Sequence, residues 1–244
     1  MTKKLNHYKA LTFDCYGTLI DWESGIWDAL QPLIHQNHRN DITRSIALEA
    51  YAAIESKQQA ETPAMIYPQI LQNVHETFAR QFDLETTDAL NQAFGNSVAH
   101  WPAFPDAADA LRALQQHFKL VILSNIDNES FAASNQKLGV IFDAIYTAED
   151  IGAYKPAPGN FTYMLDKLEA EHDIGPGDIL HTAQSLFHDH VPAKNIGLDC
   201  AWIDRQNLST SENWGATARV EKRPQVDFIF PTLQALADDV KNEQ

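Results

Sequence analysis

The chain has very little cysteine. Among its 244 residues there are only two cysteines, Cys15 and Cys200, and they lie far apart. Neither belongs to a CxxC pair, so the sequence argues against both a zinc site and a disulfide framework.

Basic residues are also scarce. The chain has 18 Lys and Arg against 33 Asp and Glu, a formal net charge of −15. The basic surface that nucleic acid requires is therefore missing, and non-specific DNA binding would be repelled. The simplest meaning of this acidity is solubility. An anionic substrate would need a local positive patch against this field.

Long apolar runs are absent from the sequence. None approaches the roughly 20 residues that span a bilayer, and the N-terminal stretch MTKKLNHYKA lacks the apolar core of a signal peptide. We therefore expect a cytoplasmic protein with no membrane partner. The length and the hydrophobic content of 44% suffice for one large domain or for a domain with a smaller insert.

Short apolar runs are what the sequence does contain. Runs of this length are typical of buried strands in a parallel sheet. We expect strands at 10–13, 119–125, 144–148, 178–183, 199–204 and 226–230. Helical patterns alternate with the later strands, at 105–118, 128–139, 157–171, 186–197 and 231–242. This alternation predicts an α/β fold with a Rossmann-like, doubly wound parallel sheet.

About 100 residues separate the first two expected strands, which is too long for a loop. They contain four helical patterns, at 25–38, 42–61, 67–84 and 87–101. We therefore expect two domains, an α/β core formed by 1–20 and 101–244 and a helical cap formed by 21–100. The polar stretch 205–225 is expected to be a surface loop.

Polar residues follow four of the expected strands, and open α/β sheets bind ligands at this edge. Asp14 is the first of them. Asp favours turns and caps, but a carboxylate can also form a covalent ester with an electrophilic carbon or phosphorus. The YGTL stretch that follows predicts a turn whose backbone N–H groups can hold an anion beside it.

Ser124 and Asn125 close the second expected strand. They could cap the next helix, or present a hydroxyl and helix N-terminal amides to an anion. Lys155 lies in a loop stiffened by two prolines. On the surface it would be a solvated charge. In a pocket of carboxylates it would pair with Asp14, keep that acid ionised and face an anionic substrate.

Asp189 lies in the stretch AQSLFHDHVPAKNIG, where it could cap a helix. His188 and His190 flank it, and such neighbours on a helix point in different directions, whereas a metal pair normally needs i, i+4 spacing. The sequence therefore argues against a zinc site formed with His181.

The chain resembles the haloacid dehalogenase superfamily in four residues at these strand ends, namely Asp14, Ser124, Lys155 and Asp189. The resemblance covers nearly the whole chain, and the helical insert matches that superfamily's cap. Most members are magnesium-dependent phosphatases or mutases. They carry a second Asp two residues after the nucleophile and an acid in a GDS motif, and the matching residues here are Tyr16 and Gln184.

Both differences have chemical consequences. Gln184 removes one negative charge from a site for Mg²⁺, which prefers charged oxygen ligands. Tyr16 removes the proton donor that a phosphate leaving group needs, whereas a halide needs none. The stretches FDCYGTLIDW, LSN and YKP therefore most resemble the (S)-2-haloacid dehalogenase branch. This resemblance implies a hydrolase for carbon–halide bonds without metal or cofactor.

The resemblance also implies a mechanism. Asp14 would attack the α-carbon of a short 2-haloalkanoate, halide would leave with inversion, and water would hydrolyse the aspartyl ester to a 2-hydroxy acid. Lys155 would orient Asp14, Asp189 would activate or position water, and Ser124 would hold the substrate carboxylate. The substrate-binding residues implied in the same way are Tyr16, Thr18, Asn125, Ser185 and His188.

The sequence departs from that branch in two places. An arginine from the cap usually holds the halide there, but the matching stretch EAYAAIESKQQAETP has none, which leaves Lys57, Gln58 or Gln59 as substitutes. The branch's Ser-Asn-aromatic-Asp run reads QSLFHD here. His188 thus replaces the aromatic residue, and it either helps to activate water or is a packing or solvent-facing residue.

Two other functions remain open on the sequence. The first is a phosphatase of the same superfamily with a reduced Mg²⁺ site, which would release phosphate from a small phosphoester. The second is a non-catalytic protein that uses the fold for binding, which would turn over neither class of substrate. The resemblance further suggests a homodimer.

Overall fold

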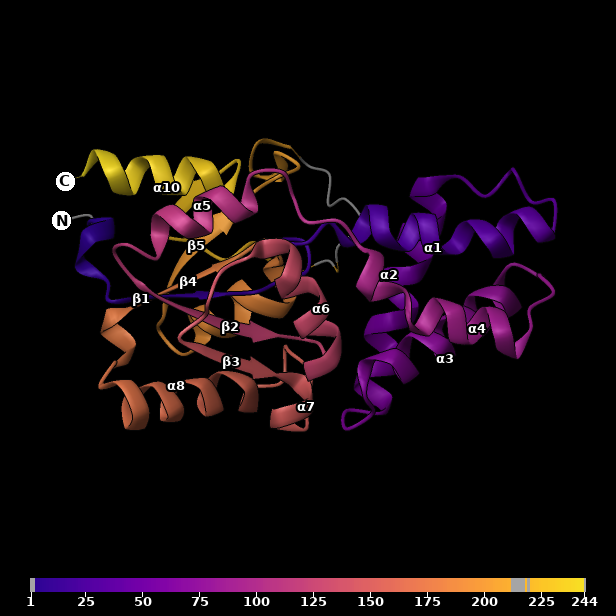
Figure 1. Cartoon of the computed structure of the whole chain (residues 1–244), viewed down its shortest axis with the longest axis horizontal. Coiled ribbons are helices and arrows are strands. Elements are labelled where there is room, and N and C mark those ends of the chain that lie inside the picture. Colours follow the sequence, from indigo (N-terminus) through magenta and orange to yellow (C-terminus); the bar gives the residue numbers. More distant parts are fainter. Residues whose placement is uncertain (1–2, 212–217, 219, 244) are drawn as a thin grey trace.

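The computed structural model describes residues 3–211, 218 and 220–243. A parallel sheet with helices on both faces forms one part of the molecule, and a group of helices forms the other (Figure 1). Both chain termini lie on the side of the sheet far from that helical group.

The sheet has six parallel strands in the order β3-β2-β1-β4-β5-β6. They are β1 (Ala10–Phe13), β2 (Lys119–Ser124), β3 (Ala144–Thr147), β4 (Ile179–Ala183), β5 (Asp199–Ile203) and β6 (Phe228–Phe230). All six expected strands form, and the predicted α/β fold with a doubly wound sheet is confirmed. The strand order reverses between β1 and β4, and in such sheets this is the point where ligands bind.

Side chains alternate between the two faces of the sheet, as the pleat of a strand requires. Leu120 and Ile122 pack into the larger core cluster, whereas Val121 and Leu123 pack into the second. The larger cluster includes residues of α5 (Ala107–Leu114), α6 (Asn128–Leu138) and α10 (Leu233–Asn242). The second includes residues of α8 (Gly159–His172) and α9 (Val191–Asn195).

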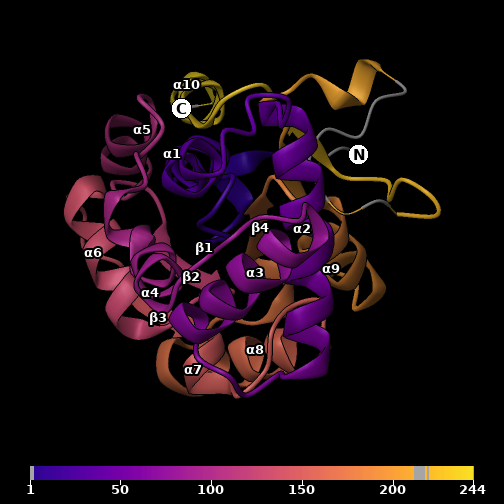
Figure 2. The ribbon, with the colours of Figure 1, turned by 90° about the vertical axis from the view of Figure 1, so that its right-hand side faces the viewer.

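The helical group follows β1 in the chain and lies beyond the carboxyl ends of the strands (Figure 1). Figure 2 looks onto these helices with the sheet behind them. The helical group consists of α1 (Trp22–Gln36), α2 (Arg44–Glu61), α3 (Tyr67–Gln81), α4 (Asp88–Gly95) and η2 (Ser97–His100). Thr43 and Thr87 cap α2 and α4 through their side chains. We propose that residues 21–100 form a cap domain on a core made by the rest.

The shorter elements complete the chain. They are η1 (Leu5–His7), α7 (Ala148–Ile151), η3 (Pro176–Asp178), η4 (Leu186–His190) and η5 (Leu208–Thr210). The helix expected at 186–197 begins as the π-helical turn η4 and continues as α9, with Pro192 in its first turn. Of the loop expected at 205–225, residues 212–217 and 219 lie outside the described residues.

None of the described helices combines the length and the apolar character needed to cross a bilayer.

Candidate active site

The tight turn after β1 presents Asp14. The backbone N–H groups of Leu19 and Ile20 both donate to the carbonyl of Cys15, at 2.7 and 2.9 Å. Gly17 lies in this turn with φ of +97°, a conformation that other residues rarely adopt. A Cβ at this position would lie 3.1 Å from Oε1 of Gln184. The glycine therefore lets the turn close tightly beside the carboxylate.

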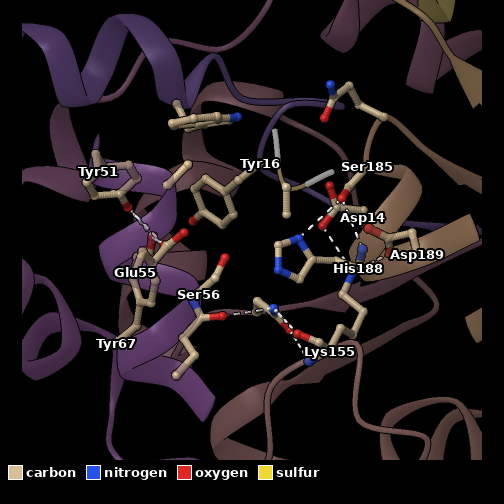
Figure 3. Close-up of a pocket in the computed structure, with 16 residues that line it drawn as sticks. Asp14, Tyr16, Tyr51, Glu55, Ser56, Tyr67, Lys155, Ser185, His188 and Asp189 are labelled. Atoms are coloured by element: carbon tan, nitrogen blue, oxygen red, sulfur yellow. Dashed lines mark hydrogen bonds and ion pairs between the residues drawn. The ribbon is translucent and has the colours of Figure 1, made fainter. Parts of the chain in front are cut away.

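Lys155 is the central cation of the site, and its side chain is only 1% exposed. Its Nζ donates three hydrogen bonds: to Asp14 Oδ1 at 3.1 Å, to Asp189 Oδ1 at 2.6 Å and to the carbonyl of Leu123 at 2.8 Å. These three bonds use all three ammonium protons. The expected pairing of Lys155 with Asp14 is therefore present in the structure, together with a second carboxylate (Figure 3).

Asn125 holds the backbone of Lys155 in place. Its Oδ1 accepts from the Lys155 N–H at 2.6 Å, and its Nδ2 donates to the Lys155 carbonyl at 3.0 Å. The helix cap that the sequence allowed for Ser124 and Asn125 is instead provided by Asp127, whose Oδ1 accepts from the Ser130 N–H at 2.9 Å. Asn125 thus acts on the lysine loop rather than on α6.

Asp189 is tied into the sheet through a histidine. Its Oδ1 lies 3.0 Å from Nε2 of His181, whose Nδ1 lies 2.9 Å from the hydroxyl of Thr12. Oδ2 of Asp189 is buried without a hydrogen-bond partner among the described residues. Asp189 does not serve as the helix cap, because Ser185 caps η4. One carboxylate oxygen is therefore left to bind something that enters the site.

Thr18 supports the nucleophile candidate from the other side. Its hydroxyl donates to Asp14 Oδ2 at 3.0 Å and accepts from the Gln184 N–H at 2.9 Å. Both oxygens of Asp14 thus have a donor, Lys155 on one and Thr18 on the other. The carboxylate is held in one orientation.

The two carboxyl groups that share the ammonium have different acidities. Burial raises the pKa of Asp14 to about 6, against the opposing effect of Lys155. Burial also acts on Asp189, but Lys155 and His181 outweigh it and hold the pKa of this carboxyl well below its usual range. Burial lowers the pKa of His188 to about 4, so this ring is neutral near pH 7.

These groups meet at a cavity of about 80 Å³ between the sheet and the helices. Seven residues expected at the site line it: Asp14, Tyr16, Asn125, Lys155, Ser185, His188 and Asp189. Thr18 and Ser124 do not. Thr18 instead donates a hydrogen bond to Asp14. Ser124 is buried, and its hydroxyl has no hydrogen-bond partner among the described residues.

The cap contributes a wall of which the sequence analysis named only Gln59. Its lining residues are Trp22, Tyr51, Ala52, Glu55, Ser56, Gln59 and Tyr67. Five of the seven recur at helical spacing along α2, and this periodicity could have found them. Of the three proposed substitutes for an arginine, only Gln59 lines the cavity. Lys57 is exposed beside Glu61, and Gln58 bonds to Thr62.

The donor set fits a divalent metal poorly. Near the cavity, Oδ1 of Asp14 and Oδ1 of Asp189 both face the same ammonium, and Gln184 supplies an amide instead of a carboxylate. Across the described ranges, no group of three or more His, Cys, Asp or Glu residues is placed to hold a metal ion. Magnesium prefers several charged oxygen ligands, so we derive no chemical step through a metal.

Comparisons with known proteins agree on the type of fold. A family model described as haloacid dehalogenase-like hydrolase matches residues 8–181. (S)-2-haloacid dehalogenase 4A of Burkholderia cepacia is 28% identical over 209 residues, which cover 81% of this chain and 84% of that protein. Ribulose-1,5-bisphosphate 5-phosphatase of Halopiger xanaduensis is 27% identical over 172 residues, 66% of this chain and 70% of that one.

A solved structure extends the match to nearly the whole fold. It is the L-2-haloacid dehalogenase from Xanthobacter autotrophicus with chloropropionic acid covalently bound, and it superposes with a TM-score of 0.78. Its sequence is 20% identical, and the match covers 97% of this chain and 100% of that chain. The arrangement of sheet and helices is therefore shared.

The burial of Lys155 leads to a prediction about the stability of the fold. Lys155→Met leaves two buried carboxylates without their cation, so we expect it to lower the free energy of unfolding by about 3–5 kcal/mol in urea titrations near pH 7. Lys167→Met is the matched control, since Lys167 forms an exposed i, i+4 pair with Glu171 and lies 5.9 Å from the centre of the Tyr163 ring, and it should cost about 1 kcal/mol or less. Equal losses in the two variants would contradict the central role of Lys155.

Proposed function

The chain belongs to the haloacid dehalogenase-like hydrolases, and we propose that within this family it hydrolyses the carbon–halogen bond of short 2-haloalkanoic acids, with Asp14 as the nucleophile. One observation carries this proposal. Asp14 lines the cavity with both oxygens held by donors, while the residue two positions later is Tyr16 rather than an acid. The hydroxyl of Tyr16 lies 2.9 Å from Oγ of Ser134, and burial raises the pKa of this phenol well above its usual range, so it is a poor proton donor to a phosphate ester.

The first step is a displacement at carbon. A carboxylate oxygen of Asp14 attacks the α-carbon on the side opposite the halogen, the carbon–halogen bond breaks, and the halide leaves with its electron pair. The product is an ester between Asp14 and the substrate. Fixing the carboxylate through Lys155 and Thr18 favours this step, because an in-line displacement depends mainly on positioning.

The second step regenerates the enzyme. Water attacks the carboxyl carbon of Asp14, the bond from that carbon to the ester oxygen breaks, and the 2-hydroxy acid leaves with one proton released. Lys155 offsets the negative charge that develops during this attack. Asp189 is a weak base because of its low pKa, so we assign its free Oδ2 to positioning the water.

The other residues expected at the site are proposed to have the following roles. Tyr16, Asn125, Ser185 and His188 line the cavity and are proposed to contact the substrate. Asn125 also fixes the lysine loop. The hydroxyl of Ser124 would have to reach the substrate carboxylate from behind the cavity wall, so its catalytic role stays a prediction. The homodimer and the cytoplasmic location likewise stay predictions.

A phosphatase is the second candidate function. The similarity to the Halopiger phosphatase favours this function. Against it, Tyr16 and Gln184 stand at positions where such a phosphatase would use acidic residues. Release of phosphate instead of halide would distinguish this candidate.

The nucleophile is tested by Asp14→Asn, which keeps the shape of the side chain but removes its charge. We expect halide release from 2-chloropropionate to fall at least about a thousandfold, measured with a halide electrode in the presence of EDTA. The wild-type protein should be equally active with and without the chelator. Halide release at the parent rate by the variant would show that another group attacks the substrate.

The pH dependence follows from the acidity of Asp14. Since only the carboxylate attacks, and burial raises the pKa of Asp14 to about 6, kcat/KM for halide release should rise with pH through a single limb near 6. The variant His188→Gln tests whether this titration belongs to Asp14 or to His188. The limb should persist in this variant, because the pKa of His188 is about 4. A limb that disappears with His188 would assign the titration to the histidine.

A further inference from the structure

An acid and two phenols form a cluster on the cap side of the cavity. Oε1 of Glu55 accepts from the hydroxyl of Tyr51 at 2.9 Å and from the hydroxyl of Tyr67 at 2.5 Å, and the two hydroxyls lie 3.0 Å apart. All three residues line the cavity. Figure 3 shows them on the α2 side, across from Asp14, Lys155 and Asp189. The two tyrosines therefore fix how the carboxyl group faces the cavity.

The second oxygen of Glu55 is left for a ligand. Its Oε2 has no hydrogen-bond partner within the described part of the chain, and the side chain is only partly exposed. Both bonds from the tyrosines go to Oε1. An ionised carboxylate can only accept hydrogen bonds, so Oε2 calls for a donor from whatever fills the cavity.

None of the described lining residues is a cation that is free to pair with Oε2 of Glu55. Lys155 already donates three hydrogen bonds, and the pKa of His188, lowered by burial to about 4, keeps this ring neutral. Three acids, Asp14, Glu55 and Asp189, thus face one lysine around the described cavity. A negative group beside Glu55 would be repelled, whereas a hydroxyl or an ammonium would be attracted.

We propose that Glu55 determines specificity by accepting a hydrogen bond from a hydroxyl or amino group on the side chain that is attached to the reacting carbon of the substrate. This inference rests on the proposed function and names the substrates within it: 2-haloalkanoic acids whose side chain carries an O–H or N–H donor. Tyr51 and Tyr67 are positioning residues that hold the acceptor. The displacement at the α-carbon is the same for these substrates as for the simple acids.

A site built around such an acceptor favours substrates that carry the donor, because an analogue without one displaces water from Oε2 of Glu55 and leaves this oxygen unpaired. We expect kcat/KM for 3-hydroxy- or 3-amino-2-chloropropionate to exceed that for 2-chloropropionate by about tenfold or more. Assays at pH 8 favour the ionised form of Glu55, whose pKa is raised by burial.

Glu55→Gln is the test variant, since it keeps the size of the side chain and removes its charge. We expect it to reduce the preference for the donor-bearing substrates at least about fivefold, because kcat/KM should fall more for these substrates than for 2-chloropropionate. Glu49→Gln is the matched control on the same helix, because Glu49 is exposed and only accepts a bond from Ser45. It should leave the preference unchanged.

A binding measurement makes the test independent of turnover. In the Asp14→Asn background, 3-hydroxypropionate or 3-aminopropionate should raise the melting temperature more than propionate does, and adding Glu55→Gln should abolish this difference. If only 3-aminopropionate raises the melting temperature more than propionate does, Glu55 binds a cation. If 3-hydroxypropionate does so as well, Glu55 accepts from any hydrogen-bond donor.

The outcomes separate the two proposals. If no haloacid releases halide, the proposed function fails, and the melting shifts still decide the role of Glu55. If halide is released with equal kcat/KM for all three acids, or if Glu55→Gln changes neither the preference nor the melting shifts, the inference about Glu55 is wrong. Stronger binding of propionate than of its donor-bearing analogues would also overturn it.

Discussion

The site depends on one buried ammonium group. Lys155 holds Asp14, Asp189 and the carbonyl of Leu123 with its three protons, so the end of β1, strand β2 and the turn η4 meet the lysine loop at a single atom. Without that charge, two carboxylates could not stay ionised side by side in a buried place. The roles that we propose for Asp14 and Asp189 both depend on this interaction.

Much of the fold was predictable, because continuous apolar runs and helical periods are local signals. The runs at 10–13 and 119–125 became adjacent parallel strands, β1 and β2, although about 100 residues separate them. The convergence of Asp14, Lys155 and Asp189 then follows from the topology, since parallel strands bring their carboxyl ends to one edge. The start of the helix after β4 was less predictable, because it begins with the π-helical turn η4.

The direction in which the cap helices face and the hydrogen-bond network could not be predicted in the same way. A partner such as His181 looks like any residue of a buried strand, and only the folded structure shows its ring against Asp189. Ser124 is a different case: its place at a strand end suggested a substrate contact, its side chain is not among the residues that line the cavity, and its role stays a prediction. The role of Glu55 depends on how the cap lies over the sheet, which is a property of packing rather than of sequence pattern.

The most direct measurement of the nucleophile is a single turnover in H₂¹⁸O with enzyme in excess over 2-chloropropionate. If Asp14 forms the ester and water attacks its carboxyl carbon, the first 2-hydroxy acid carries ordinary oxygen and the peptide containing Asp14 gains one ¹⁸O by mass spectrometry. Heavy oxygen in the first product, with an unlabelled Asp14 peptide, would mean that water attacks the substrate directly, and it would contradict covalent catalysis by this residue.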